Sequence, residues 1–166
     1  MKIEKIYFDL DGVLADFSAG LWKYCGIDPI AQGALKNGVE NPMWEAIKKV
    51  DHFFDKLVPM PEAIELFEKL SEKYNCEILS AIPRPHRGIK YSEEDKRAWV
   101  KRYLGPDVVA NIVFRSEKKQ FCRGAGFILI DDYQKNVDEW NEGGGFVILY
   151  DGNQTVIDAI EKYIKG

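Results

Sequence analysis

The sequence is poor in cysteine: it has 3 cysteines among 166 residues, widely spaced and with no C-x-x-C pair. An odd number of dispersed cysteines predicts reduced, mostly buried thiols rather than a disulfide framework or a zinc site. Long hydrophobic runs are also missing, since none approaches the roughly 20 apolar residues of a membrane helix. The first residues, MKIEKIYFDLDG, carry charges where a signal peptide is apolar. We therefore expect a cytoplasmic protein without a membrane span.

The excess of one sign of charge is small, with 23 basic and 27 acidic residues and a net charge of −4. This balance offers no broad positive surface to a nucleic-acid polymer or an anionic membrane. Hydrophobic residues make up 46% of the chain and charged residues 30%, as in folded globular proteins. A chain of this length buries roughly 70% of its unfolded surface. The composition predicts one domain, or one core with a small insertion.

Short apolar runs alternate with segments of helical periodicity. Runs without strict polar alternation are typical of strands buried on both faces. The predicted strands are residues 3–8, 76–79, 127–130 and 146–150, with a weaker one at 111–114, and the predicted helices are 61–74, 92–104 and 154–164. Ser92 and Asp95 open the second helix in the manner of a capping box. The alternation predicts an α/β fold, a Rossmann-like parallel sheet with helices on both faces.

Residues 18–58 depart from this alternation. They contain no convincing strand, and they hold several aromatic residues among glycines, prolines and helix formers. The stretch is too long for an ordinary connection between a strand and a helix. We expect a small helical cap here, inserted after the first strand, with the core formed by residues 1–17 and 59–166.

Two predicted strands end in carboxylates. Asp9 and Asp11 follow the first strand and, being two residues apart, can face the same side at the carboxyl edge of the sheet. Asp131 and Asp132 end another strand, and neighbouring carboxylates repel unless a cation such as Mg²⁺ lies between them. The alternative is that one carboxylate of each pair only caps a turn or a helix.

A serine and a lysine extend this pattern. Ser80 ends a predicted strand, and its hydroxyl and the backbone N–H groups that follow could bind a phosphate oxygen. Lys118 and Lys119, in the sequence RSEKK, offer an ammonium group to an anion. Read alone, such a serine is an ordinary turn residue and such a lysine pair an ordinary surface feature.

In this order, the motifs resemble those of the haloacid dehalogenase (HAD) superfamily of phosphotransferases. The D-x-D-G-V sequence resembles its first motif, Ser80 its second, a lysine its third and Asp131-Asp132 its fourth. The segments FDLDGVLADF, Phe53-Phe54, PMPEA, EDKRAWV and ILIDD further resemble the cytosolic type C 5'(3')-deoxyribonucleotidase family. That family removes phosphate from deoxynucleoside monophosphates and carries a small helical cap between its first two motifs. Ser80 stands where the family usually has threonine, and Glu117 before Lys118 favours Lys118 over Lys119 as the third motif.

The resemblance implies a role for each of these residues. Asp9 would attack phosphorus and form an aspartyl-phosphate, and Asp11 would act as general acid and then general base. The implied ligands of Mg²⁺ are Asp9, the main-chain carbonyl of Asp11, and one or both of Asp131 and Asp132. The implied ligands of the phosphoryl group are Ser80, Ala81 and Lys118.

The expected substrate is a small (deoxy)nucleoside monophosphate rather than a polymer. Aromatic rings of the predicted cap could stack on a base, or they could form the core of the cap itself. Arg84 could contact sugar or base, or pair with carboxylates of the cap. The aromatic candidates are Phe17, Trp44, Phe53 and Phe54.

Two other functions stay open. One is a HAD phosphatase that acts on another small phosphoester, such as a sugar phosphate. The other is a non-catalytic nucleotide-binding protein of HAD fold, whose expected sign is loss of Asp9 or Asp11, both of which are present. The sequence does not determine the base or sugar preference, the position of the phosphate or the oligomeric state.

Overall fold

Five parallel strands form one sheet in the computed structural model, which describes residues 1–30, 42–151 and 155–166. The strands lie in the order β3-β2-β1-β4-β5. The chain passes from β1 to β2 and β3 on one side and then returns to β4 and β5 on the other, so the strand order reverses between β1 and β4. Their bounds are Lys5–Phe8 for β1, Cys76–Ala81 for β2, Ala110–Val113 for β3, Phe127–Asp131 for β4 and Phe146–Leu149 for β5.

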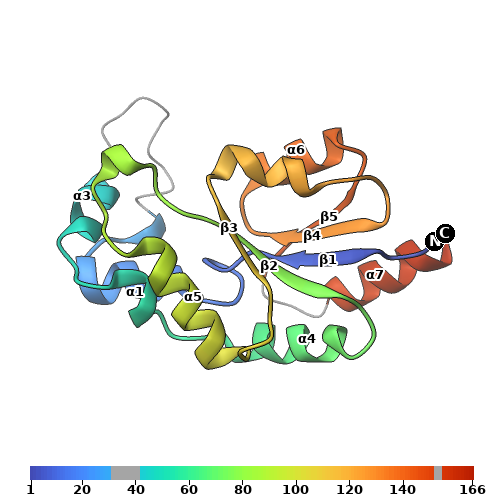
Figure 1. The fold of residues 1–166 in the computed structure, drawn as a ribbon, viewed down its shortest axis with the longest axis horizontal. Helices are drawn as coiled ribbons and strands as arrows, with labels where there is room; N and C mark the ends of the chain where they lie inside the picture. The colour runs from blue at the N-terminus through green and yellow to red at the C-terminus, as the bar shows by residue number, and fades with distance from the viewer. Residues whose placement is uncertain (31–41, 152–154) are drawn as a thin grey trace.

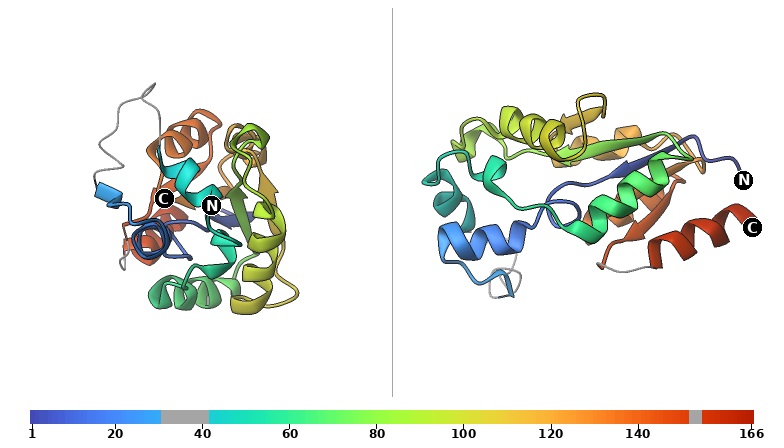
Figure 2. Two further views of the ribbon diagram at one scale, coloured as in Figure 1. Left: turned by 90° about the vertical axis from the view of Figure 1, so that its left-hand side faces the viewer. Right: turned by 90° about the horizontal axis from the view of Figure 1, so that it is seen from below.

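Helices cover both faces of the sheet, as predicted (Figures 1 and 2). Alternate strand residues point to opposite faces, so Phe8 contributes to one hydrophobic core and Tyr7 to the other. The helices α4 (Pro61–Ser71), α5 (Ser92–Tyr103) and α7 (Thr155–Lys165) pack on the Phe8 side, and α6 (Gln134–Glu142) and the 3₁₀ helix η4 (Arg115–Phe121) on the Tyr7 side. The predicted α/β class is therefore confirmed.

The start of α5 differs from the prediction, because the capping box is not formed. Tyr91 is the N-cap residue, with φ of 62° and no side-chain cap, and Ser92 is already helical. The Asp95 carboxylate pairs instead with His52 Nδ1 at 2.7 Å. A contact with a distant segment therefore replaces the local cap that the sequence suggested.

Helical segments occupy the described part of residues 18–58, and no strand occurs there among the described residues. They are α1 (Phe17–Gly20), the π-helix η1 (Leu21–Cys25), α3 (Pro42–Lys48) and the 3₁₀ helix η2 (Phe53–Lys56), and residues 31–41 of the predicted cap lie outside the described residues. These segments lie at the end of the molecule to which β1 points (Figure 1). The η2 segment is fixed to α5, since Trp99 Nε1 donates to the Leu57 carbonyl at 2.7 Å and Arg102 pairs with Asp55 at 2.9 Å.

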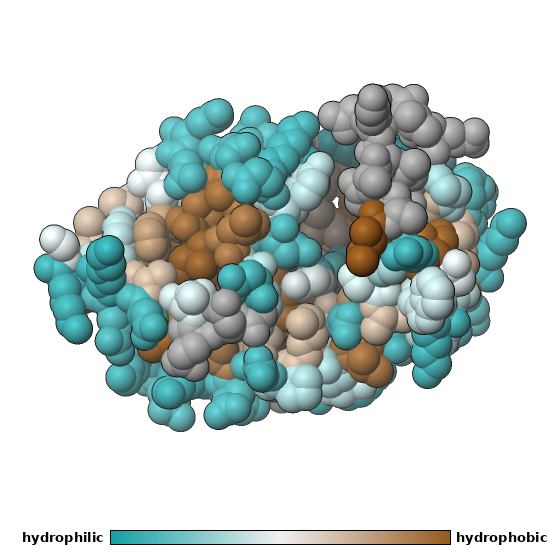
Figure 3. All heavy atoms as spheres, turned by 180° about the vertical axis from the view of Figure 1, so that it is seen from behind, coloured by the Kyte–Doolittle hydropathy of each residue, from teal (hydrophilic) through white to brown (hydrophobic). Residues whose placement is uncertain are grey.

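The face drawn in Figure 3 carries a group of hydrophobic side chains left of its centre, surrounded by hydrophilic ones, and smaller hydrophobic groups on its other half. On the edge strand β5, Leu149 is 47% exposed. Within the described ranges, no helix is both long and apolar enough to span a bilayer. The thiols of Cys25, Cys76 and Cys122 are free and partly buried.

Candidate active site

The site is built where the strand order reverses, at the carboxyl ends of β1 and β4. Ligands of open α/β sheets bind at such a reversal. Asp9 follows β1, and its backbone N–H donates to the Ile130 carbonyl of β4 at 2.9 Å. Asp131 is the last residue of β4. Parallel pairing therefore brings the two carboxylates side by side, and oxygens of Asp9, Asp131 and Asp132 lie within 4.8 Å of one another.

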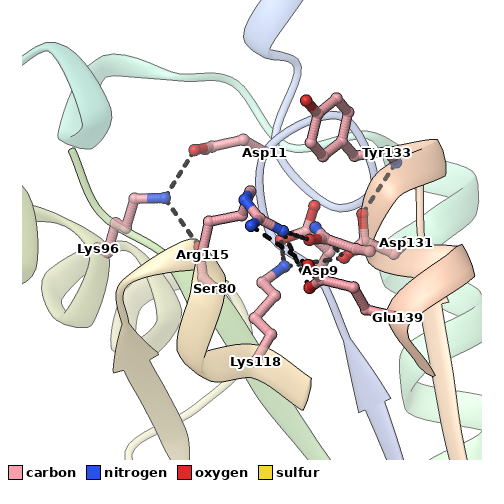
Figure 4. Close-up of polar contacts among 10 residues, drawn as sticks. Asp9, Asp11, Ser80, Lys96, Arg115, Lys118, Asp131, Tyr133 and Glu139 are labelled. Carbon is pink, nitrogen blue, oxygen red and sulfur yellow. Dashed lines mark hydrogen bonds and ion pairs between the residues drawn. The ribbon is translucent and has the colours of Figure 1, made fainter. Parts of the chain in front are cut away.

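Lys118 connects two of these carboxylates. The η4 helix carries its side chain under the strand ends, where Nζ donates to Asp9 Oδ1 and Asp131 Oδ2, each at 2.8 Å (Figure 4). Burial by itself lowers the pKa of the Lys118 ammonium, but the charges of Asp9 and Asp131 outweigh burial, so its pKa is raised. The structure thus brings Lys118 into the site, whereas Lys119 is exposed to solvent.

Asp131 is held by groups that the sequence analysis missed. Its Oδ1 accepts the Tyr133 backbone N–H at 2.9 Å, and its Oδ2 accepts Asn136 Nδ2 at 3.1 Å. Arg115 in turn donates to Asn136 Oδ1 at 3.2 Å and pairs with Glu139 at 3.0 Å (Figure 4). Asn136 shares the buried stripe of α6 with Val137 and Trp140. A polar residue among the apolar positions of that helix face was the sequence feature that could have indicated the role of Asn136.

Gly12 makes room for Asp132. A Cβ atom on Gly12 would lie 1.9 Å from Asp132 Oδ2, and the φ of Gly12 is +82°, a region that favours glycine. Asp132 as a whole residue is exposed, but its carboxyl is crowded by neighbours. Loss of hydration raises its pKa to about 8, with further contributions from the charges of Asp9 and Asp131. Burial, followed by the charge of Asp9, also raises the pKa of Asp131.

The donor set fits a hard divalent cation. With all three carboxylates ionised beside one ammonium group, the cluster would carry an excess of two negative charges. Burial, and then this crowding of like charges, raises the pKa values of Asp131 and Asp132. Mg²⁺ prefers carboxylate and water oxygens. The side chain of Asp11 is not part of this cluster among the described residues.

Asp11 and Ser80 are brought together by Lys96, which the sequence analysis also missed. Lys96 Nζ donates to Asp11 Oδ2 at 2.6 Å and to Ser80 Oγ at 2.8 Å (Figure 4). Lys96 is fully buried, and its ammonium lies 4.7 Å from the centre of the Phe54 ring. The signal was its spacing, since Lys96 shares one face of α5 with Trp99 and with other buried residues.

The predicted substrate-binding aromatics divide into two groups. Phe53 and Phe54 are 2% and 3% exposed and pack edge to face at 5.3 Å, so they belong to the core. Phe17 packs edge to face on Phe53 at 5.8 Å and is partly buried. Trp44 is also partly buried, with the Arg87 guanidinium 5.9 Å from its ring centre.

The predicted residues next to Ser80 lie at the end of β2. Ala81 directly follows Ser80 as the last residue of that strand. Arg84 contacts neither the carboxylate cluster nor a cap carboxylate in any described interaction; it donates to Ser116 Oγ at 2.8 Å and stacks on the Phe114 ring at 4.4 Å.

Comparison with known proteins identifies relatives of this chain. The model of a family described as "5' nucleotidase, deoxy (Pyrimidine), cytosolic type C protein" matches residues 32–161, a range that begins after Asp9 and Asp11. A putative 5'(3')-deoxyribonucleotidase of Vibrio phage KVP40 is 34% identical over 131 residues, covering 79% of this chain and 67% of that protein. The human mitochondrial 5'(3')-deoxyribonucleotidase is 30% identical over 148 residues, covering 77% and 61%. The chain thus spans about two thirds of the length of these curated relatives.

Solved structures share the fold at low sequence identity. A HAD-superfamily hydrolase from Ehrlichia chaffeensis aligns with a TM-score of 0.56 at 15% identity, covering 99% of this chain and 98% of that one. A hydrolase from Streptococcus pneumoniae aligns with a TM-score of 0.55 at 14% identity, covering 97% and 100%.

Proposed function

The chain belongs to the family of cytosolic type C 5'-nucleotidases, and on that premise we propose that it is a Mg²⁺-dependent phosphomonoesterase that acts on deoxynucleoside monophosphates. One observation carries the proposal. Asp9, Asp131 and Asp132 converge at the point where the strand order reverses, and Lys118 is fixed between two of them. A carboxylate cluster that is too negative by itself and is held by a buried lysine suits a phosphoryl group and a cation.

Asp9 is the proposed nucleophile. Its carboxylate forms a bond to phosphorus while the bond from phosphorus to the sugar oxygen breaks, which gives an aspartyl-phosphate and splits one difficult displacement into two easier ones. Lys118 holds Asp9 Oδ1 at 2.8 Å, which fixes the carboxylate for attack. The same ammonium offsets negative charge on the phosphoryl oxygens.

Asp11 is the proposed acid and base. It gives a proton to the sugar oxygen that leaves, and it then takes a proton from the water that hydrolyses the aspartyl-phosphate. Its Oδ1 is buried and has no hydrogen-bond partner among the described residues, so this oxygen is the one proposed to exchange the proton.

The metal site would use the cluster already described. Asp9, Asp131 and Asp132 would hold Mg²⁺, together with the main-chain carbonyl of Asp11, and the bound ion would offset repulsion between carboxylates and phosphate. Ser80, the backbone N–H of Ala81 and Lys118 are the proposed phosphate ligands.

The substrate specificity is assigned to the segment over this edge of the sheet. We retain residues 18–58 as the proposed cap, and Trp44 and Phe17, which are only partly buried, as the rings proposed to meet the base. Phe53 and Phe54 then support the cap from within. The proposed location is the cytoplasm.

A substrate panel tests the proposal. Phosphate release is measured from deoxynucleoside monophosphates, ribonucleoside monophosphates and sugar phosphates, each with Mg²⁺ and with a chelator. The expected result is Mg²⁺-dependent release that is fastest from deoxynucleoside monophosphates and absent in Asp9→Asn, with Lys119→Met as the control that retains it. Release that is fastest from sugar phosphates would contradict the nucleotidase assignment, and no release from any ester would contradict the enzymatic one.

A further inference from the structure

We propose that Lys96 is the positioning residue for the acid–base step, an inference that rests on the proposed function. Its ammonium bonds to Asp11 Oδ2 at 2.6 Å and to Ser80 Oγ at 2.8 Å. Lys96 lies in the EDKRAWV segment, to which the sequence analysis gave no role. Lys96 comes from α5, whereas Asp11 follows β1 and Ser80 lies on β2. One side chain thus ties together the proposed acid–base group and a proposed phosphate ligand.

The burial of Lys96 argues against a purely structural ion pair. Lys96 is 0% exposed, and a buried charge costs free energy that a hydrophobic residue of similar volume would not. Trp99 and Val100, on the same face of α5, show that this position lies within an apolar core. A charge retained there, and bonded only to two residues of the site in the described hydrogen bonds, fits a functional constraint.

The two oxygens of Asp11 are treated differently. Lys96 holds Oδ2, and Oδ1 is buried without a hydrogen-bond partner among the described residues. A carboxylate fixed by one oxygen has a defined rotamer, so its second oxygen has a defined direction. A proton-transfer group must lie within hydrogen-bond distance of the atom it serves. Lys96 therefore sets the direction of Oδ1 toward the leaving oxygen.

Lys96 itself is held in place by the segment around η2. The Phe54 ring lies 4.7 Å from its ammonium, and the hydrogen bond from Trp99 to the Leu57 carbonyl joins α5 to the chain after η2. The ammonium consequently has a carboxylate, a hydroxyl and an aromatic ring as fixed neighbours. This arrangement restricts Nζ to one location.

The inference has a chemical signature that lost packing would not produce. A sugar oxygen is a poor leaving group and needs the proton from Asp11, whereas a nitrophenolate leaves without one. Loss of Lys96 should therefore slow formation of the aspartyl-phosphate from a deoxynucleoside monophosphate far more than from p-nitrophenyl phosphate. General acid catalysis contributes about 10²–10⁴-fold, so the ratio of the two kcat/KM values, which report the steps up to formation of the aspartyl-phosphate, should fall by about 100-fold or more.

The experiment compares Lys96→Met, Lys96→Arg and the control Lys101→Met, which changes an exposed lysine of the same helix. We expect kcat/KM for the deoxynucleoside monophosphate to fall by about 100-fold or more in Lys96→Met, with kcat/KM for p-nitrophenyl phosphate nearly unchanged. Lys96→Arg should recover part of the ratio, and Lys101→Met should leave it unchanged. Thermal unfolding of each variant measures the effect on folding separately.

Other outcomes overturn the inference. An equal fall in kcat/KM for both esters would overturn it. A fall caused by a higher KM would assign Lys96 to phosphate binding through Ser80, and any other equal fall would assign it to general structure. If Lys96→Met does not fold, Lys96→Arg provides the test instead. The longer arginine side chain displaces Asp11, so the ratio of the values for the two esters must still fall. Inactivity of the unaltered protein on both esters would refute the proposed function itself, which is a distinct result.

Discussion

Replacing Gly12 by alanine probes the carboxylate cluster through the backbone that supports it. A Cβ at this position would lie 1.9 Å from Asp132 Oδ2 and 2.6 Å from Cγ, so the carboxylate must retreat to the 3.4 Å of ordinary van der Waals contact. Functional groups tolerate displacements of only about 0.5 Å. The φ of +82° adds a backbone cost of about 1–2 kcal/mol for alanine.

Gly144→Ala is the matched control. Gly144 has nearly the same φ, +79°, but a Cβ there would meet nothing within 4 Å. Both variants should lose about 1–2 kcal/mol of unfolding free energy, which corresponds to several degrees of Tm for a chain of this length. Only Gly12→Ala should also lose metal affinity, by about 10–100-fold, as metal sites do when their supports are altered.

The assays are thermal unfolding in chelator and a Mg²⁺ titration of phosphate release. The expected result is a similar Tm loss in both variants, together with a higher Mg²⁺ requirement in Gly12→Ala alone. A Mg²⁺ requirement in Gly12→Ala equal to that of the unaltered protein would refute the assignment of Asp132 as a metal ligand.

Five further predictions concern single residues. Asp9→Asn should fold with an unchanged Tm yet lose nearly all turnover, because an amide is a poor nucleophile; substantial residual phosphate release would contradict this. Lys118→Ala should reduce kcat far more than Lys119→Ala, because only Lys118 bonds to Asp9 and Asp131; the reverse ranking would place the motif lysine at 119. The pKa of Asp132 is raised to about 8, so Mg²⁺ must displace a proton below that pH. The Mg²⁺ requirement measured by calorimetry should therefore rise about tenfold for each pH unit below 8 and stay constant above it. A Mg²⁺ requirement that does not vary with pH would count against Asp132 as a metal ligand. By linkage, the raised folded-state pKa also lowers the free energy of unfolding of the metal-free protein as pH rises from about 4 to 8. Phe53→Ala should cost about 3–5 kcal/mol of unfolding free energy, because Phe53 is 2% exposed. Trp44→Ala should instead raise KM for deoxynucleoside monophosphates and leave KM for sugar phosphates unchanged.

The parts of the fold that depend on the local pattern of apolar and polar residues could be predicted from the sequence. Apolar runs such as Ile128–Ile130 form strands buried on both faces, and the strand-end carboxylates meet because parallel pairing places them at one edge. The observed strands differ from the predicted ones only at their ends. Helix α6 was not among the predicted helices, because few of its residues are apolar and its buried face includes Asn136.

Contacts between distant segments could not be predicted from the same patterns. Ser92 and Asp95 have the spacing of a capping box, but His52 pairs with Asp95 and the N-cap is Tyr91. Lys96 stood in a buried stripe without an evident partner, since Asp11 is 85 residues away in sequence. The sequence also did not distinguish the aromatic residues by burial. Phe53 and Phe54 are buried, whereas Trp44 is more accessible.

The most direct test of the central claim is to locate the phosphoryl group during turnover. Asp11→Asn is mixed with p-nitrophenyl phosphate and Mg²⁺, so that the first step proceeds without an acid while the hydrolysis of the intermediate lacks its base. Acid quenching and peptide mass spectrometry then identify the modified residue. We predict one equivalent of nitrophenol per active site and one phosphoryl group on Asp9. Release of nitrophenol without a phosphoryl group on Asp9, or with the group on another residue, would contradict the account.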